Sequence, residues 1–300
     1  MTALLLGLLG LALSLGAPRL LAGARWPDRA PVAAILLWQA VTLTAVLCAL
    51  GVVLAAPEEA VRAAGSGRPA AVAALTAALA VATVIVLRLL GSLAGVMRRS
   101  RAGRARHRML VDLLDRAERR RDLPLDGVRV LDGALPFAYC VPGRSPRVVL
   151  SDGALRVLDR TQIDAVLAHE SAHLRHRHDL VMESFTAFHR AVPRPLRSRA
   201  PLDAVHLLLE MVADDAARRR TGPGPLRAAL ELLGDVPEAG GATVSGTARD
   251  RGRRLDRLAT ERASAAVSAL AVVAACAILV LPTVILVVPW LGSALRSWPL

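Results

Sequence analysis

The sequence has no lysine, few aromatic residues and few cysteines. All 38 basic residues are therefore arginine, and Phe, Trp and Tyr together make up 3% of the 300 residues. The three cysteines, Cys48, Cys140 and Cys276, form no C-x-x-C pair. The sequence thus supports neither a disulfide framework nor a thiolate metal site. Hydrophobic residues, mostly Ala, Leu and Val, reach 54%, and the mean hydropathy is +0.45. Such a composition is typical of membrane-spanning helices.

Four long stretches carry almost no charge, and each is long enough to cross a bilayer core, which takes roughly 20 helical residues. They lie at about residues 2–21, 31–56, 69–96 and 263–295, with Arg88 as the main interruption. We expect three transmembrane helices within residues 1–97, and a fourth with a short C-terminal tail in residues 263–300. The first stretch could instead be a cleaved signal peptide, because "AGA" at residues 22–24 resembles a cleavage site. No basic residue precedes it, which favours a retained helix.

The arginines indicate the orientation of the chain. "MRRSRAGRARHR", with six arginines and no acid, follows the third stretch, and "RDRGRRLDR" precedes the fourth. The positive-inside rule then predicts residues 98–262 in the cytoplasm and both termini outside the cell membrane. A membrane-anchored nucleic-acid binder would also use the net charge of +13. No helix-turn-helix or aromatic platform accompanies it, so no nucleic acid is expected.

Residues 98–262 are enough for one compact domain. "VRVLDG" and "RVVLSDGAL" predict two short strands, and the segment "PFAYCVPGRSP" between them is rich in turn residues. Residues 158–191 predict one long helix, residues 201–220 a second, and residues 235–247 a Gly-rich linker. The expected fold class is a multi-pass α-helical membrane protein whose cytoplasmic domain is mainly α with a small β-sheet.

The long helix carries the motif His169-Glu170-Ser171-Ala172-His173. Two histidines four residues apart lie on one face of a helix, where both imidazoles can bind one Zn²⁺. Glu170 lies about 100° further round, within reach of a water molecule on that ion. This is the HExxH pattern of zinc peptidases, in which the glutamate is the general base. The apolar face formed by residues 163, 166 and 167 predicts a packed helix rather than a solvated one.

A catalytic zinc needs a third protein ligand. Glu210 is the leading candidate, because a carboxylate among leucines is costly to bury unless it is paired or bound to a cation. Asp214 follows on the same face and can orient an imidazole. His206, four residues before Glu210, is a candidate to contact a metal ligand or to bind an oxyanion. The alternative is an ordinary exposed histidine. His176 and His178 compete as metal ligands, His176 in a three-histidine site.

HExxH, the following "RHD" and a later E-x-x-A-D resemble the gluzincin membrane metallopeptidases. The families are M56, the BlaR/MecR antirepressor peptidases, and its M48 relatives, the HtpX and Ste24 proteases; three spans before the domain and one after resemble M56 in particular. The resemblance implies one zinc ion per chain, bound by His169, His173 and Glu210, with Glu170 catalytic and Asp214 supporting a ligand. The antirepressors carry an extracellular sensor after the last span. We expect none here, so the resemblance implies the peptidase and not the signal.

The implied activity is endoproteolysis of a membrane protein or a cytoplasmic regulator. The strand "RVVLS" is expected to offer a sheet edge on which an extended peptide pairs. A non-proteolytic signalling or scaffold protein with the same metal ligands is the alternative, since it does not need Glu170. The sequence predicts contact with a lipid bilayer but no particular oligomeric state.

Overall fold

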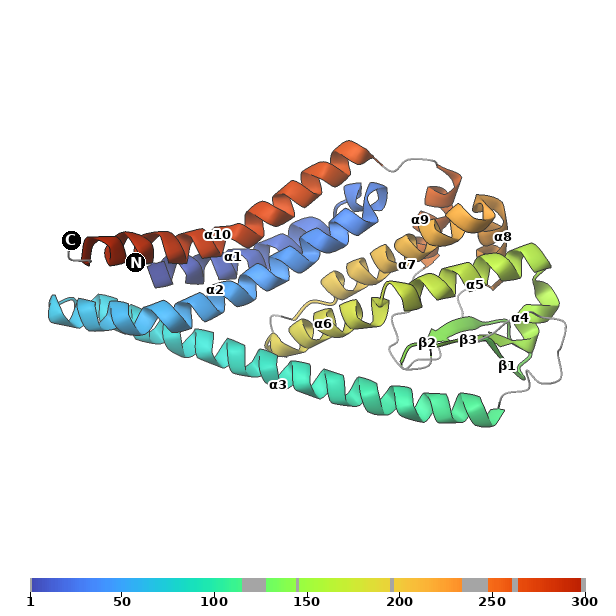
Figure 1. The fold of residues 1–300 in the computed structure, drawn as a ribbon, viewed down its shortest axis with the longest axis horizontal. Coiled ribbons are helices and arrows are strands. Elements are labelled where there is room, and N and C mark those ends of the chain that lie inside the picture. Colours follow the sequence, from blue (N-terminus) through green and yellow to red (C-terminus); the bar gives the residue numbers. More distant parts are fainter. Residues whose placement is uncertain are drawn as a thin grey trace. The chain divides into compact units, whose positions relative to one another are not determined.

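The computed structural model describes residues 2–114, 128–143, 146–194, 197–233, 248–260 and 264–297. It divides into two compact units, each described here by itself (Figure 1). The first unit comprises residues 1–94, 187–201 and 264–300, and the second comprises residues 95–186 and 202–263. The predicted linker at 235–247 lies outside the described residues.

The first unit is built from long apolar helices. They are α1 (Thr2–Ala22), α2 (Pro31–Gly65), the first part of α3 (Pro69–Leu114) and α10 (Ala265–Ser297), with a short 3₁₀ helix, η1 (Trp26–Arg29), before α2. In the described part of the chain, four helices are long and apolar enough to cross a membrane. The predicted mostly helical architecture with membrane-spanning candidates is therefore confirmed, whereas the cytoplasmic orientation stays a prediction.

Helices α1, α2 and α10 pack against one another (Figure 1). Proline at position 282 of α10 has no N–H, so the carbonyl of Ile278, four residues earlier, lacks its usual helical donor. The buried hydroxyl of Thr44 on α2 donates to that carbonyl at 3.1 Å. This bond satisfies a backbone acceptor in a segment where lipid offers none.

Two side chains of α3 bind the end of α6 (His178–Ala191). Arg88 Nε donates to the carbonyl of Ala191 at 2.8 Å, and the hydroxyl of Ser92 donates to the carbonyl of Ala187 at 2.8 Å. The last carbonyls of a helix have no intrahelical donor. Arg88, the charge inside the third apolar stretch, therefore caps a second helix.

The second unit contains a three-stranded sheet of β1 (Val128–Leu131), β2 (Ala138–Val141) and β3 (Arg147–Ser151). The order is β1-β3-β2, with β3 parallel to β1 and antiparallel to β2. β3 is thus paired on both sides, and the prediction that "RVVLS" offers a free edge is wrong. The segment rich in turn residues supplies the second neighbour, because the strand β2 forms within it.

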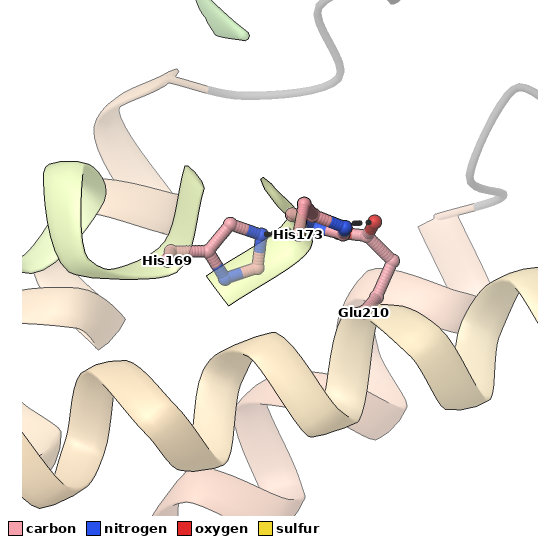
Figure 2. A group of neighbouring side chains, drawn as sticks. All are labelled: His169, His173 and Glu210. Atoms are coloured by element: carbon pink, nitrogen blue, oxygen red, sulfur yellow. Dashed lines mark hydrogen bonds and ion pairs between the residues drawn. The ribbon is translucent and has the colours of Figure 1, made fainter. Parts of the chain in front are cut away.

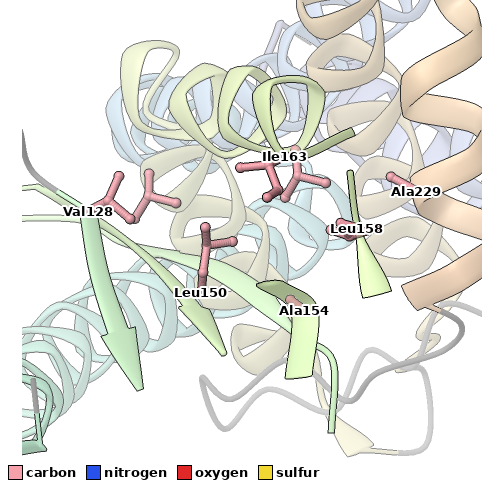
Figure 3. Close-up of a cluster of buried hydrophobic side chains, with 8 residues drawn as sticks. Val128, Leu150, Ala154, Leu158, Ile163 and Ala229 are labelled. Atoms are coloured by element: carbon pink, nitrogen blue, oxygen red, sulfur yellow. The ribbon is translucent and has the colours of Figure 1, made fainter. Parts of the chain in front are cut away.

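The sheet and the following helices enclose one hydrophobic core (Figure 3). Ser151 ends β3 and caps α4 (Asp152–Val157) by accepting from the N–H of Ala154. Asp159 then begins α5 (Arg160–Arg175) with a capping box completed by Gln162. The buried residues of this core are Val128, Val148, Leu150, Ala154, Leu158, Ile163, Val166 and Ala229. Strand, cap and core together fix the position of α5.

A glycine allows the turn between β1 and β2 to approach the start of α4. Gly153 donates its N–H to the carbonyl of Gly133 at 2.8 Å. A Cβ at this position would lie 2.4 Å from the carbonyl oxygen of Ala134. Only glycine fits this close approach of two backbone segments.

The predicted long helix over residues 158–191 is in fact two helices, α5 and α6. The chain leaves the helix at His176, and Arg177 takes a left-handed conformation with φ 54° before α6 begins. The second predicted helix is present as α7 (Ala200–Thr221), and Gly222, with φ 81°, follows its last residue. Helix α8 (Pro223–Leu233) packs on α5, and α9 (Ala248–Ala259) packs on α8.

Candidate metal centre

Three side chains from two helices point toward one another in the second unit. His169 and His173 come from α5 and Glu210 comes from α7 (Figure 2). One potential ligand atom of each lies within 4.8 Å of the others. The two Nε2 atoms are 3.1 Å apart. Glu210 places Oε2 at 3.4 Å from Nε2 of His169 and Oε1 at 3.3 Å from Nε2 of His173.

These separations fit a small divalent cation. Ligands held 2.0–2.1 Å from zinc at tetrahedral angles lie about 3.3–3.4 Å from one another. The donor set of two imidazoles and a carboxylate is also one that zinc accepts in peptidases. The described residues can therefore hold the metal that the sequence predicts.

The ligand group is largely buried, with the Glu210 side chain 13% exposed beside buried leucines of α7. Burial by itself raises the pKa of Glu210. The positive charge of Arg254, and next that of His173, more than offsets this and holds the pKa well below its ordinary value. Glu210 is thus ionised, the form in which a carboxylate binds metal.

Asp214 lies beside the first histidine. Its side chain is 1% exposed, and Oδ1 lies 3.0 Å from Nδ1 of His169. Burial opposes protonation of His169, yet the carboxylates of Asp214 and Glu210 outweigh it and raise the pKa of His169 to about 10. The arrangement matches the carboxylate–histidine pairs that orient metal ligands.

Arg254 is the main contributor that the sequence did not reveal. From α9 it donates through Nε and Nη2 to the two carboxylate oxygens of Asp214, at 2.8 and 2.7 Å. Its Nη1 lies 2.9 Å from Oε2 of Glu210. Burial raises the pKa of Asp214, but Arg254 lowers it to about 2. The only signal was the arginine-rich stretch around residue 254, which indicated membrane topology.

The second histidine has a different neighbour. Nδ1 of His178 lies 2.8 Å from Nδ1 of His173. His178 is 5% exposed, and burial, together with the charge of nearby His173, lowers its pKa to about 3. His176 is exposed and stacks on His178 with ring centroids 5.9 Å apart. Among the described residues, neither joins the group of three potential ligands.

Glu170 and His206 complete the list of predicted site residues. Glu170 is half-buried on α5, next to His169, and its charge acts on Arg254. His206 is half-buried on α7, outside the group of three potential ligands found in the described parts of the chain. The roles assigned to both stay predictions.

Comparison with protein families matches residues 100–275 to Peptidase family M48. The match covers more than half of the chain and includes α5, α7 and α9. The chain belongs to peptidase family M48. This family consists of zinc metallopeptidases, and the M48 part of the predicted resemblance is confirmed. The M56 part is not confirmed.

Curated relatives of this M48 chain are named "Protease HtpX homolog". That of Salinibacter ruber is 38% identical over 96 residues, which are 31% of this chain and 32% of the relative. That of Thermodesulfovibrio yellowstonii is 32% identical over 81 residues, 26% of this chain and 28% of the relative. The chain thus spans about a third or less of the length of these relatives. No solved structure matches it.

Proposed function

We propose that this M48 chain is a membrane-anchored zinc endopeptidase that hydrolyses peptide bonds of a protein substrate. His169, His173 and Glu210 hold one zinc ion. The observation that carries the proposal is the convergence of these three side chains to within 4.8 Å inside the segment that matches the family.

A zinc ion in this group would lower the pKa of a water molecule and polarise the carbonyl of the peptide bond. As the water oxygen bonds to the carbonyl carbon and the C–N bond breaks, Glu170 would take a proton from the water and pass it to the leaving amine. Asp214 holds the His169 ring with its Nε2 toward the other ligands. Arg254 neutralises part of the negative charge of Glu210 and Asp214, which lets both carboxylates stay ionised while buried.

The proposed location is the cell membrane, with the peptidase unit on the cytoplasmic side and both termini outside. The six arginines between residues 98 and 108 support this orientation. Substrates reached from such an anchor are membrane proteins or cytoplasmic regulators.

The test uses the full chain purified in detergent, compared with Glu170→Gln. We expect one zinc per chain in both proteins, and a fall of roughly 10²–10⁴-fold in cleavage of an unfolded protein substrate for the variant. Glu231→Gln is the matched control, because Glu231 is exposed on α8 and forms an ion pair with Arg227 of the same helix. It should cleave like the wild type.

Two results would contradict the proposal. If the wild-type protein contains no stoichiometric zinc, the proposed metal centre is wrong. If zinc-loaded wild type cleaves no faster than Glu170→Gln, the peptidase activity is wrong and the non-proteolytic alternative is favoured.

If the proposal holds, a comparison of proteomes from cells carrying the two proteins identifies the substrate, whose fragment disappears with Glu170→Gln.

A further inference from the structure

We infer that His178 is a positioning residue that fixes the orientation and tautomer of His173 for metal binding. The inference rests on the proposed zinc site and deepens it. It assigns to the second imidazole ligand a partner of its own, as Asp214 partners the first.

The geometry of His173 carries the argument. Its Nε2 faces Glu210 at 3.3 Å and His169 at 3.1 Å, so this nitrogen belongs to the ligand group. Its other ring nitrogen, Nδ1, lies 2.8 Å from Nδ1 of His178, and the two rings are perpendicular, with centroids 4.7 Å apart. Nε2 of His173 therefore faces the other potential ligands, while Nδ1 faces His178.

The protons on the two rings follow from this pairing. A nitrogen that binds zinc carries no proton, so neutral His173 carries its proton on Nδ1. That N–H donates to Nδ1 of His178, which is then the acceptor. His178 in turn keeps its own proton on Nε2. The pair thus selects the tautomer of His173 that binds metal through Nε2.

The break between α5 and α6 is what brings His178 to this place. In an unbroken helix, a residue five positions after His173 would lie about 140° around the axis, away from it. The left-handed conformation of Arg177 redirects the chain, and His178 becomes the first residue of α6. Such a conformation is uncommon for a residue other than glycine.

The first turns of α6 are also anchored to α3. Nη1 of Arg104 lies 3.5 Å from Oδ2 of Asp179 and forms an ion pair with Glu183. All three side chains are at most 22% exposed. The residue next to His178 is therefore held in place, and His178 itself is 5% exposed. A buried, anchored acceptor can restrict the ring of His173.

The two ligands consequently differ in their support. His169 lies against the carboxylate of Asp214, whereas His173 lies against an imidazole. An imidazole acceptor orients its partner without adding a negative charge. The site already contains Glu170, Glu210 and Asp214, so a neutral partner limits its charge.

The experiment measures zinc affinity of the full chain in detergent by competition with a chelator, and the absorption spectrum after loading with Co²⁺. His178→Leu removes the acceptor and should weaken zinc binding roughly 10–100-fold, as does loss of other partners of metal-bound histidine. It should also change the Co²⁺ spectrum. His178→Asn keeps an acceptor oxygen and should restore most of the affinity. His176→Leu, at the exposed neighbour, should bind zinc like the wild type.

A structural role of His178 predicts a different pattern. In that case, the leucine and asparagine variants would lose the same amount of metal-free thermal stability. Their zinc affinities would be either both unchanged or both reduced by the same factor, and each of these two results overturns the inference. Zinc affinity of His178→Leu within twofold of the wild type overturns it as well. Wild-type protein that binds no zinc contradicts the proposed function itself. If the wild type binds zinc and His178→Leu binds it with the same affinity, only the inference is contradicted.

Discussion

Replacing Arg254 by methionine removes the guanidinium that balances two buried carboxylates. The lost contacts are two hydrogen bonds to Asp214, at 2.8 and 2.7 Å, and one contact of 2.9 Å to Glu210. The carboxylate side chains are 1% and 13% exposed. Breaking a buried ion pair by removing one partner costs about 3–5 kcal/mol. For a unit of this size, that lowers the melting temperature of the metal-free chain by roughly 6–20 °C.

Zinc should restore part of this loss. Without Arg254, Glu210 and Asp214 lose the guanidinium that contacts both of them, and a divalent cation takes over its electrostatic role. Binding to the folded state alone raises stability with ligand concentration and affinity. The stabilisation by added zinc should therefore be larger in Arg254→Met than in the wild type.

The assay is thermal unfolding of the full chain in detergent, followed by circular dichroism, with chelator and with zinc. Arg257→Met is the control, because Arg257 lies one turn further along α9 and pairs with Asp215 at 2.6 and 2.7 Å. It should lower stability without changing the increment from zinc. The electrostatic reasoning is refuted if Arg254→Met has the same metal-free unfolding temperature as the wild type. It is also refuted if zinc raises the unfolding temperature of all three proteins by the same amount.

Four further substitutions test other parts of the structure. Glu210→Ala should abolish stoichiometric zinc in metal analysis; a variant that retains one zinc per chain contradicts the ligand assignment. Thr44→Val leaves the carbonyl of Ile278 unpaired in an apolar helix and should cost about 0.6–1.7 kcal/mol in unfolding experiments in detergent. Gly153→Ala forces a Cβ against the backbone of Ala134 and should cost about 1–3 kcal/mol. Gly252→Ala, with nothing within 4 Å in helix α9, should instead stabilise by about 0.5–1 kcal/mol. Equal unfolding midpoints for these two alanine variants would refute the steric argument.

Local patterns predicted the parts of the site that depend on one helix at a time. Two histidines four residues apart necessarily share a face of α5, and they do so in the structure. Glu210 stood out because a lone carboxylate in an apolar helix needs a positive partner. The four apolar helices followed from length and lack of charge.

Features that depend on long-range pairing did not follow from local patterns. The central position of β3 results from its pairing with β2 as well as β1, and β2 forms in a segment whose Pro and Gly residues indicated turns. The break of the long helix occurs at Arg177, where no glycine marks the left-handed conformation. Arg254 lies in an arginine-rich stretch that indicated only membrane topology, since its two acidic partners lie 40 or more residues earlier.

The late position of Arg254 has a consequence for biogenesis. Translation produces Glu210 and Asp214 of α7 well before the helix that carries their counter-charge, because α9 begins only at Ala248. A nascent polypeptide that ends after α8 holds two acidic side chains that are too costly to bury alone. The ribosome therefore has to synthesise the chain through α9, almost to the start of α10 at Ala265, before Glu210 and Asp214 can be buried with their counter-charge.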